Sequence, residues 1–185
     1  MIKPILATAA LAGASFLAGP PASAQHHGHA PTRHAQAPNS SYAGEESREI
    51  KALSPQEQRA WLEGQGAGLA KAAELNSHPG PMHVLEHAAE LSLSARQKRD
   101  SRELMDRHKA EVRALGAELV AAERQLDDLF RTRRATIAAV NDLTRQIGSL
   151  QGRIRASHLI AHLEQTNALR QDQVAAYDRL RGYAR

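Results

Sequence analysis

Residues 131–136, with the sequence RTRRAT, interrupt two long segments whose apolar residues recur every three or four positions. The first segment covers residues 95–130, and the second begins at residue 137. This spacing is typical of amphipathic helices, and a short break between two of them makes them antiparallel neighbours. The sequence therefore predicts a long antiparallel helical hairpin that reverses near residue 132.

The two apolar stripes also predict which residues face each other. With the reversal near residue 132, facing residues have numbers that sum to about 264. Gly116 then lies opposite Gly148, as expected where two backbones come close. In the same register His158 faces Asp106.

Two capping boxes predict where helices begin. Ser54 to Glu57 (SPQE) combines a capping serine, a glutamate three residues later and proline at the first helical position. Ser94 with Gln97 provides the same signal at the start of the first long segment. We expect a helix at each of these places.

The first of these helices is predicted to continue to Asn76. It would contain Gly64, Gly66 and Gly68, and glycines retained inside a helix usually let another backbone approach. Two further short helices are predicted over residues 82–91 and 171–182. No period-2 strand pattern is found, so the expected fold class is all-α: a long antiparallel helical hairpin with short flanking helices.

The composition favours a thin helical domain. Phe and Trp together number three residues, which cannot build a broad core, and no cysteine is available for a disulfide or a thiolate ligand. We expect one elongated helical hairpin domain over residues 42–185.

The N-terminal residues have a different character. Residues 1–24 have one lysine, a short apolar run and the small residues Ala22-Ser23-Ala24, which predicts a cleaved signal peptide and a periplasmic protein; an uncleaved anchor is the alternative. Residues 25–41 are rich in His and Pro and predict a disordered leader. Its histidines could capture metal weakly, or the leader could be a linker without function.

The charge balance argues against a nucleic-acid partner. Removal of residues 1–24 takes away Lys3 alone, leaving 23 Lys and Arg (24 minus one) against 20 Asp and Glu, a formal charge of +3. Acids alternate with bases along residues 96–134, which is typical of solvated helix faces.

Two His-x-x-x-His pairs, His83 with His87 and His158 with His162, suggest a metal site. Side chains four residues apart share a helix face, so each pair could hold one ion through two imidazoles. In the predicted register His162 lies near Glu103, and imidazoles meeting carboxylates across a helical seam are typical of metal sites in bundles. The alternative is that His158 and His162 are structural histidines paired with acids, while the other pair lies on the surface.

Residues 83–87 also match His-x-x-Glu-His, a zinc-peptidase motif in which Glu86 would act as the base. Such peptidases are much larger α/β proteins, and this chain has no sheet to form a substrate cleft. No nucleophile elbow, phosphate loop or carboxylate dyad is found. We therefore expect a protein that is not an enzyme.

The chain resembles the periplasmic Spy/CpxP and heavy-metal-resistance group, whose helices begin with L-T-x-x-Q motifs. Leu93–Gln97 (LSARQ) matches with Ser for Thr, and residues 169–173 (LRQDQ) match only at Leu and Gln. The resemblance implies a homodimer that serves the envelope metal or stress response, with unfolded envelope proteins or a membrane signalling protein as possible partners.

The CnrX- and ZraP-like members of this group are metal sensors or scavengers. The resemblance implies a metal site whose ligands follow the order found in CnrX-like sensors: His83, His87, Glu103, His158 and His162. Such ligands suit Ni, Co, Cu or Zn, and they do not choose among these metals. The function expected first is therefore binding of a divalent transition metal.

The alternative is an ATP-independent, Spy-like chaperone that holds unfolded clients without metal. Its candidate client-binding residues are arginines of the hairpin, which could attract acidic clients beside apolar patches. They are Arg131, Arg133, Arg134, Arg153 and Arg155. A solvated basic face is the other interpretation of Arg131 to Arg134.

Overall fold

The computed structural model describes residues 40–183, which belong to one compact unit, Ser40–Arg185. These residues form six α-helices, and their only β-pairing is an isolated bridge between Ile50 and Leu53. The predicted all-α class is confirmed. The predicted signal peptide and residues 25–39 of the leader lie outside the described residues.

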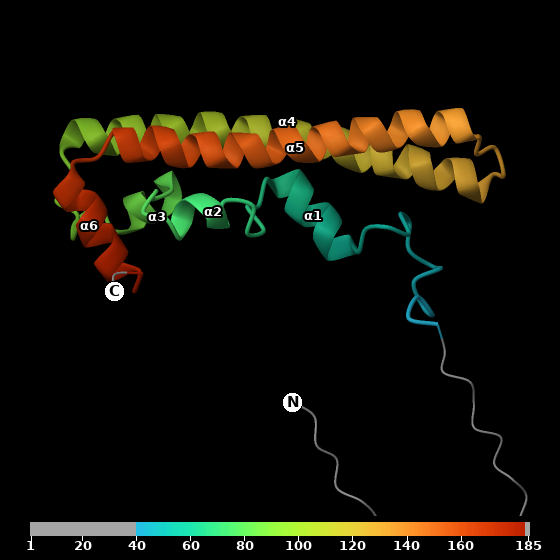
Figure 1. Cartoon of the computed structure of the whole chain (residues 1–185), viewed down its shortest axis with the longest axis horizontal. Coiled ribbons are helices and arrows are strands. Elements are labelled where there is room, and N and C mark those ends of the chain that lie inside the picture. Colours follow the sequence, from blue (N-terminus) through green and yellow to red (C-terminus); the bar gives the residue numbers. More distant parts are fainter. Residues whose placement is uncertain (1–39, 184–185) are drawn as a thin grey trace, which may run out of the picture. The chain divides into compact units, whose positions relative to one another are not determined.

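Two long helices dominate the described part of the chain. Helix α4 (Ala95–Arg131) and helix α5 (Ile137–Asn167) lie side by side and are joined by a short turn, as Figure 1 shows. Among the described residues, no helix combines the length and the apolar character that a membrane span requires.

The main core lies between these two helices. Buried side chains of both helices form one cluster, against which Trp61 and Leu69 of the preceding segment pack. Each fully buried aliphatic side chain contributes roughly 1.5–3 kcal/mol through removal from water. The cluster consists of Val112, Leu115, Leu119 and Ala122 of α4 with Ile147, Leu150 and Ile154 of α5.

Helix α1 (Pro55–Glu63) begins at the predicted capping box, since Ser54 Oγ accepts from the Glu57 N–H. The predicted continuation of this helix to Asn76 is wrong. Gly64 adopts a left-handed conformation with φ 68° and ends α1, and α2 (Lys71–Glu74) is a separate single turn. Glycine is the residue that reaches this conformation without strain, so it terminates the helix here.

Gly116 does not pair with Gly148, so this prediction is also wrong. A Cβ added to Gly116 would lie 2.0 Å from the Trp61 carbonyl oxygen, whereas one added to Gly148 would meet no atom within 4 Å. The backbone that approaches α4 at Gly116 is therefore that of α1. The matching positions of the two glycines in the hairpin register were a coincidence.

Two short helices, α3 (Pro81–Glu86) and α6 (Gln171–Leu180), pack at the end of the α4–α5 pair where α4 begins (Figure 1). Helix α3 is shorter than the predicted segment 82–91, and α6 follows α5. A second buried cluster joins them through Val84, Leu91, Leu93 and Tyr177.

The two glutamines of the L-x-x-x-Q motifs contact each other in this region. Gln97 Nε2 donates to Gln173 Oε1 at 2.8 Å, and Gln173 Nε2 donates to the Leu91 carbonyl at 3.0 Å. Gln97 also completes the predicted capping box with Ser94. At the second motif the Arg170 side chain pairs with Asp172, and Gln173 Oε1 accepts from the Arg170 N–H. The glutamines thus connect the starts of α4 and α6.

Candidate metal centre

A groove of about 740 Å³ runs between the α1–α3 segment and the α4–α5 pair. It is lined on one side by the glycine-containing loop 64–70 and the start of α3, and on the other by α4 and α5. Four imidazoles reach it: those of His83, His108, His158 and His162.

A chain of hydrogen bonds crosses the helical seam at this groove. Ser157 Oγ donates to Glu111 Oε2 at 2.7 Å and lies 3.1 Å from His108 Nδ1. His108 Nε2 lies 3.0 Å from His158 Nδ1, with the two rings nearly perpendicular. His158 therefore faces His108, and the predicted pairing with Asp106 is wrong, because the true register is shifted by two residues and leaves Asp106 exposed.

This chain of hydrogen bonds determines which nitrogen of the His108 and His158 rings carries the proton. Because the Ser157 hydroxyl proton is given to Glu111, Ser157 Oγ accepts from His108 Nδ1–H. Neutral His108 then accepts through Nε2, so His158 donates through Nδ1–H. The Nε2 atom of His158 is left with a free lone pair, and this atom is buried with no hydrogen-bond partner among the described residues.

Burial keeps this ring neutral. The pKa of His158 is lowered from 6.5 to about 4, first by burial and then by the nearby His108 and His162. The pKa of His108 is also lowered, mainly by burial, although Glu111 opposes the shift. A neutral imidazole is the form that binds a metal ion.

His162 lies one helical turn further along α5 and is oriented by the loop before α3. Its Nδ1 donates to the His78 carbonyl at 2.6 Å and lies 3.6 Å from Glu74 Oε2. Gly80 packs against the other side of the ring, since a Cβ there would lie 2.7 Å from His162 Nε2. In the neutral form of the His162 ring the lone pair is on Nε2, as it is in His158.

The carboxylate of Glu74 lines the groove beside His162. Its Oε1 accepts from Tyr177 Oη at 2.6 Å and from Tyr183 Oη at 3.2 Å, which connects α2 to α6. Burial and this bond to Glu74 raise the pKa of Tyr177. The second oxygen, Glu74 Oε2, is buried and has no hydrogen-bond partner among the described residues.

The remaining predicted ligands differ in position. His83 lines the groove, and its Nδ1 lies 2.7 Å from Glu86 Oε2, which lowers the pKa of Glu86. His87 follows the last residue of α3 and Glu103 is exposed on α4; neither lines the groove. Over residues 40–183, no three His, Asp or Glu side chains are grouped closely enough to hold one ion together.

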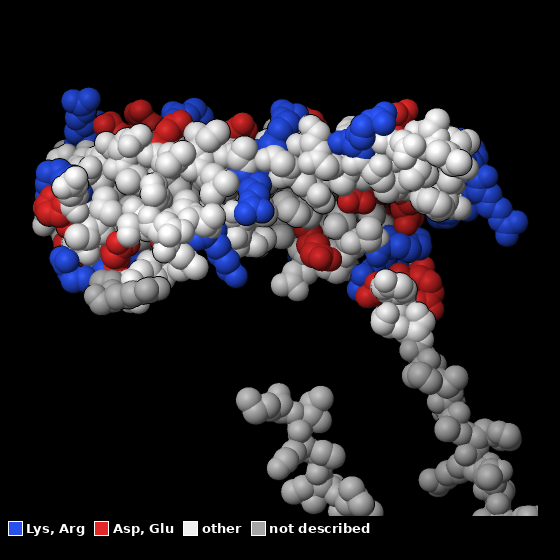
Figure 2. All heavy atoms as spheres, viewed as in Figure 1, with Lys and Arg blue, Asp and Glu red and all other residues white. Residues whose placement is uncertain are grey.

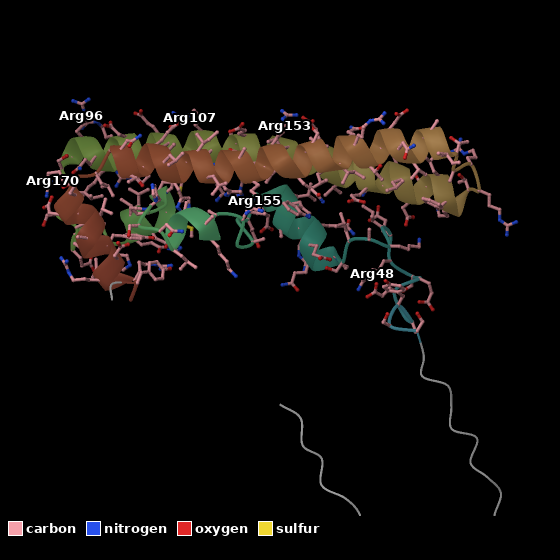
Figure 3. All side chains as sticks on the ribbon, in the orientation of Figure 1. Arg48, Arg96, Arg107, Arg153, Arg155 and Arg170 are labelled. Carbon is pink, nitrogen blue, oxygen red and sulfur yellow. The ribbon has the colours of Figure 1, made fainter. Side chains whose placement is uncertain are left out.

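The five arginines proposed for client binding are all exposed but do not form one patch. Arg131, Arg133 and Arg134 lie at the turn between the long helices, and Arg131 pairs with Asp128 at 2.7 Å. Figure 3 shows Arg153 on the outer side of the helix pair and Arg155 on the side where α1 and α2 lie.

Two residues of the groove were not predicted as site residues. His108 belongs to the apolar stripe of α4, and a polar residue in such a stripe was the available signal. Glu74 is largely buried, but it belongs to a four-residue helix whose sequence has no pattern that distinguishes it from the exposed glutamates of the chain.

No protein-family model, no curated protein and no solved structure matches this chain.

Proposed function

We propose that this protein binds a divalent transition metal in the histidine-lined groove and serves the envelope metal or stress response as a sensor or scavenger. His158 and His162 are the first two ligands in this proposal. The observation that supports it most directly is the Nε2 lone pair of His158, which is buried and has no hydrogen-bond partner within residues 40–183.

The hydrogen bonds around the two rings support this assignment. Histidines that bind metals usually donate their second N–H to a carbonyl, a carboxylate or another acceptor, which fixes the tautomer and the ring orientation. His158 donates to His108 and His162 donates to the His78 carbonyl, so both rings have this arrangement. A buried lone pair without a partner is unfavourable in a purely structural histidine.

A third ligand must come from the other wall of the groove. His83 of α3 is the candidate, because it lines the groove and its Nδ1 is hydrogen-bonded to the Glu86 carboxylate, which leaves Nε2 for a metal. These three side chains are not grouped closely enough to hold one ion in the structure, so a metal bound by all of them would draw α3 toward α5 and connect the two helices. This connection gives a physical basis for a sensor, because metal binding would change how firmly the short α3 is held.

The ligand assignment is tested by isothermal titration of chelator-treated protein with Ni²⁺, Co²⁺, Cu²⁺ and Zn²⁺. Changing His158→Ala and His162→Ala together is expected to weaken the tightest site by at least about 100-fold, because two direct ligands are lost. Residues 1–39 are kept identical in every protein, so any metal bound by the leader contributes equally.

The matched control replaces His87→Ala and Glu103→Gln, which changes two of the predicted ligands that do not line the groove. We expect its affinity to stay within about threefold of the wild type, since single contacts outside a site have little effect on binding. An unchanged affinity in the His158/His162 variant would reject the proposed site.

A further inference from the structure

The turn end of the helix pair has a surface that the metal site does not explain. We define the tip as residues 129–141, which comprise the end of α4, the turn and the start of α5. The tip lies beyond the main core, whose last partly buried member on α4 is Leu126.

Two large apolar side chains of the tip are in solvent. Phe130 is 60 % exposed and Ile137 is 85 % exposed. Neither belongs to a buried cluster of the described residues. Two large apolar side chains this exposed beside a basic turn are available for a contact with another surface.

The tip is also basic, and one of its three arginines is paired with an acid beside the tip. It contains Arg131, Arg133 and Arg134 and no acidic residue. Arg131 pairs with Asp128, just outside the tip, whereas Arg133 and Arg134 form no ion pair within residues 40–183. Figure 2 shows basic side chains projecting from this end of the pair.

Arg133 adopts a conformation that is unfavourable for its residue type. Its φ is 57°, and the Arg133 and Arg134 N–H groups donate to the carbonyls of Phe130 and Leu129 as α4 ends. This position at a helix end is usually occupied by glycine, because a Cβ is strained there. Strained backbone conformations cluster at binding surfaces and switch regions, which fits a function for this turn.

We propose that the tip binds the surface of an anionic phospholipid bilayer. The arginines fit lipid phosphates, and the exposed Phe130 and Ile137 of the same turn fit the boundary between headgroups and acyl chains. A second copy of the chain fits poorly, because two tips would bring together four arginines, Arg133 and Arg134 of each copy, that form no ion pair within residues 40–183. A polyanion such as nucleic acid would use the arginines but leave Ile137 in water.

The test measures co-sedimentation of the full chain with vesicles of phosphatidylcholine alone and with 30 % phosphatidylglycerol, both at low salt. We expect binding to the anionic vesicles to be at least tenfold stronger. Phe130→Ser with Ile137→Ser and, separately, Arg133→Gly with Arg134→Gln should each weaken it about fivefold or more, because the two kinds of contact act together. All proteins carry the same residues 1–39, so any contribution of that segment is equal.

The matched control, Arg96→Gln with Arg99→Gln, removes the same charge from the opposite end of α4 and should bind within twofold of the wild type. Arg133→Gly alone should raise the melting temperature while weakening vesicle binding, which excludes unfolding as the cause of the loss. Equal binding to both vesicle types, or no loss in the tip variants, would overturn the proposal. Loss of heparin binding with unchanged vesicle binding would assign the tip to a polyanion instead.

Discussion

His158 is 7 % exposed between α4 and α5, where its ring contacts His108 and its second nitrogen has no partner in the part of the chain that the structure describes. A buried histidine in this state resists protonation, because the charged form would lose its hydration without gaining an acid beside it. Glu111 reaches the neighbouring His108 through Ser157, and among the described residues no carboxylate forms a hydrogen bond with His158. The residue is therefore suited to present a lone pair at neutral pH.

This environment predicts an acid-sensitive fold. Because the pKa of His158 falls from 6.5 to about 4 on folding, the unfolded chain binds more protons between these values, and stability decreases as pH falls through this window. The loss attributable to this residue is at most about 3 kcal/mol. Urea unfolding of metal-free protein between pH 4.5 and 7.5 measures it.

The variant His158→Gln, which keeps a polar side chain of similar size but cannot titrate, is the comparison. It should show a shallower dependence of unfolding free energy on pH in the same range. His108, whose pKa is also lowered, accounts for the remaining slope in this variant. An identical slope in both proteins would contradict the assigned pKa of His158.

At the scale of elements, the close contact between α1 and α4 depends on one glycine. Gly116→Ala would place a methyl group 2.0 Å from the Trp61 carbonyl oxygen, so α1 must move away from α4. We expect a loss of about 2 kcal/mol in unfolding free energy, as in other overpacked contacts. Thermal unfolding followed by circular dichroism provides the measurement.

Gly148→Ala and Gly152→Ala are controls of the same type on α5. Each new methyl group would meet no atom within 4 Å, and both residues lie inside a helix. Each change should stabilise the protein by about 0.5–1 kcal/mol, because alanine favours the helix over glycine. If Gly116→Ala were as harmless as these two, the contact with α1 would be wrong.

At the scale of the whole molecule, metal binding in the groove would connect the α1–α3 segment to the long pair. A ligand present at 100 times its Kd stabilises the folded state by about 2.7 kcal/mol. We therefore expect Ni²⁺ or Zn²⁺ to raise the melting temperature by about 5–10 °C over chelator-treated protein. In the His158→Ala/His162→Ala variant the shift should be absent, and a shift of equal size there would indicate stabilisation from another site.

Local patterns in the sequence determined the helices. The capping boxes at Ser54 and Ser94 mark the starts of α1 and α4 in the structure, because a capping side chain and its partner lie within four residues. The all-α class follows from apolar residues spaced at three and four. The error at Gly64 arose because a glycine inside a helical pattern and a glycine that ends a helix look alike in sequence.

The tertiary structure decided which side chains meet. A register shift of two residues moved Asp106 into solvent and placed His108 against His158, and such a shift costs little in a stripe of similar aliphatic residues. The partners of His162 come from His78 and Glu74, more than 80 residues away in the chain, in a loop and a single-turn helix with weak local signals. Spacing within one helix specifies which residues share a face, whereas the atoms opposite that face depend on the packing of the whole chain.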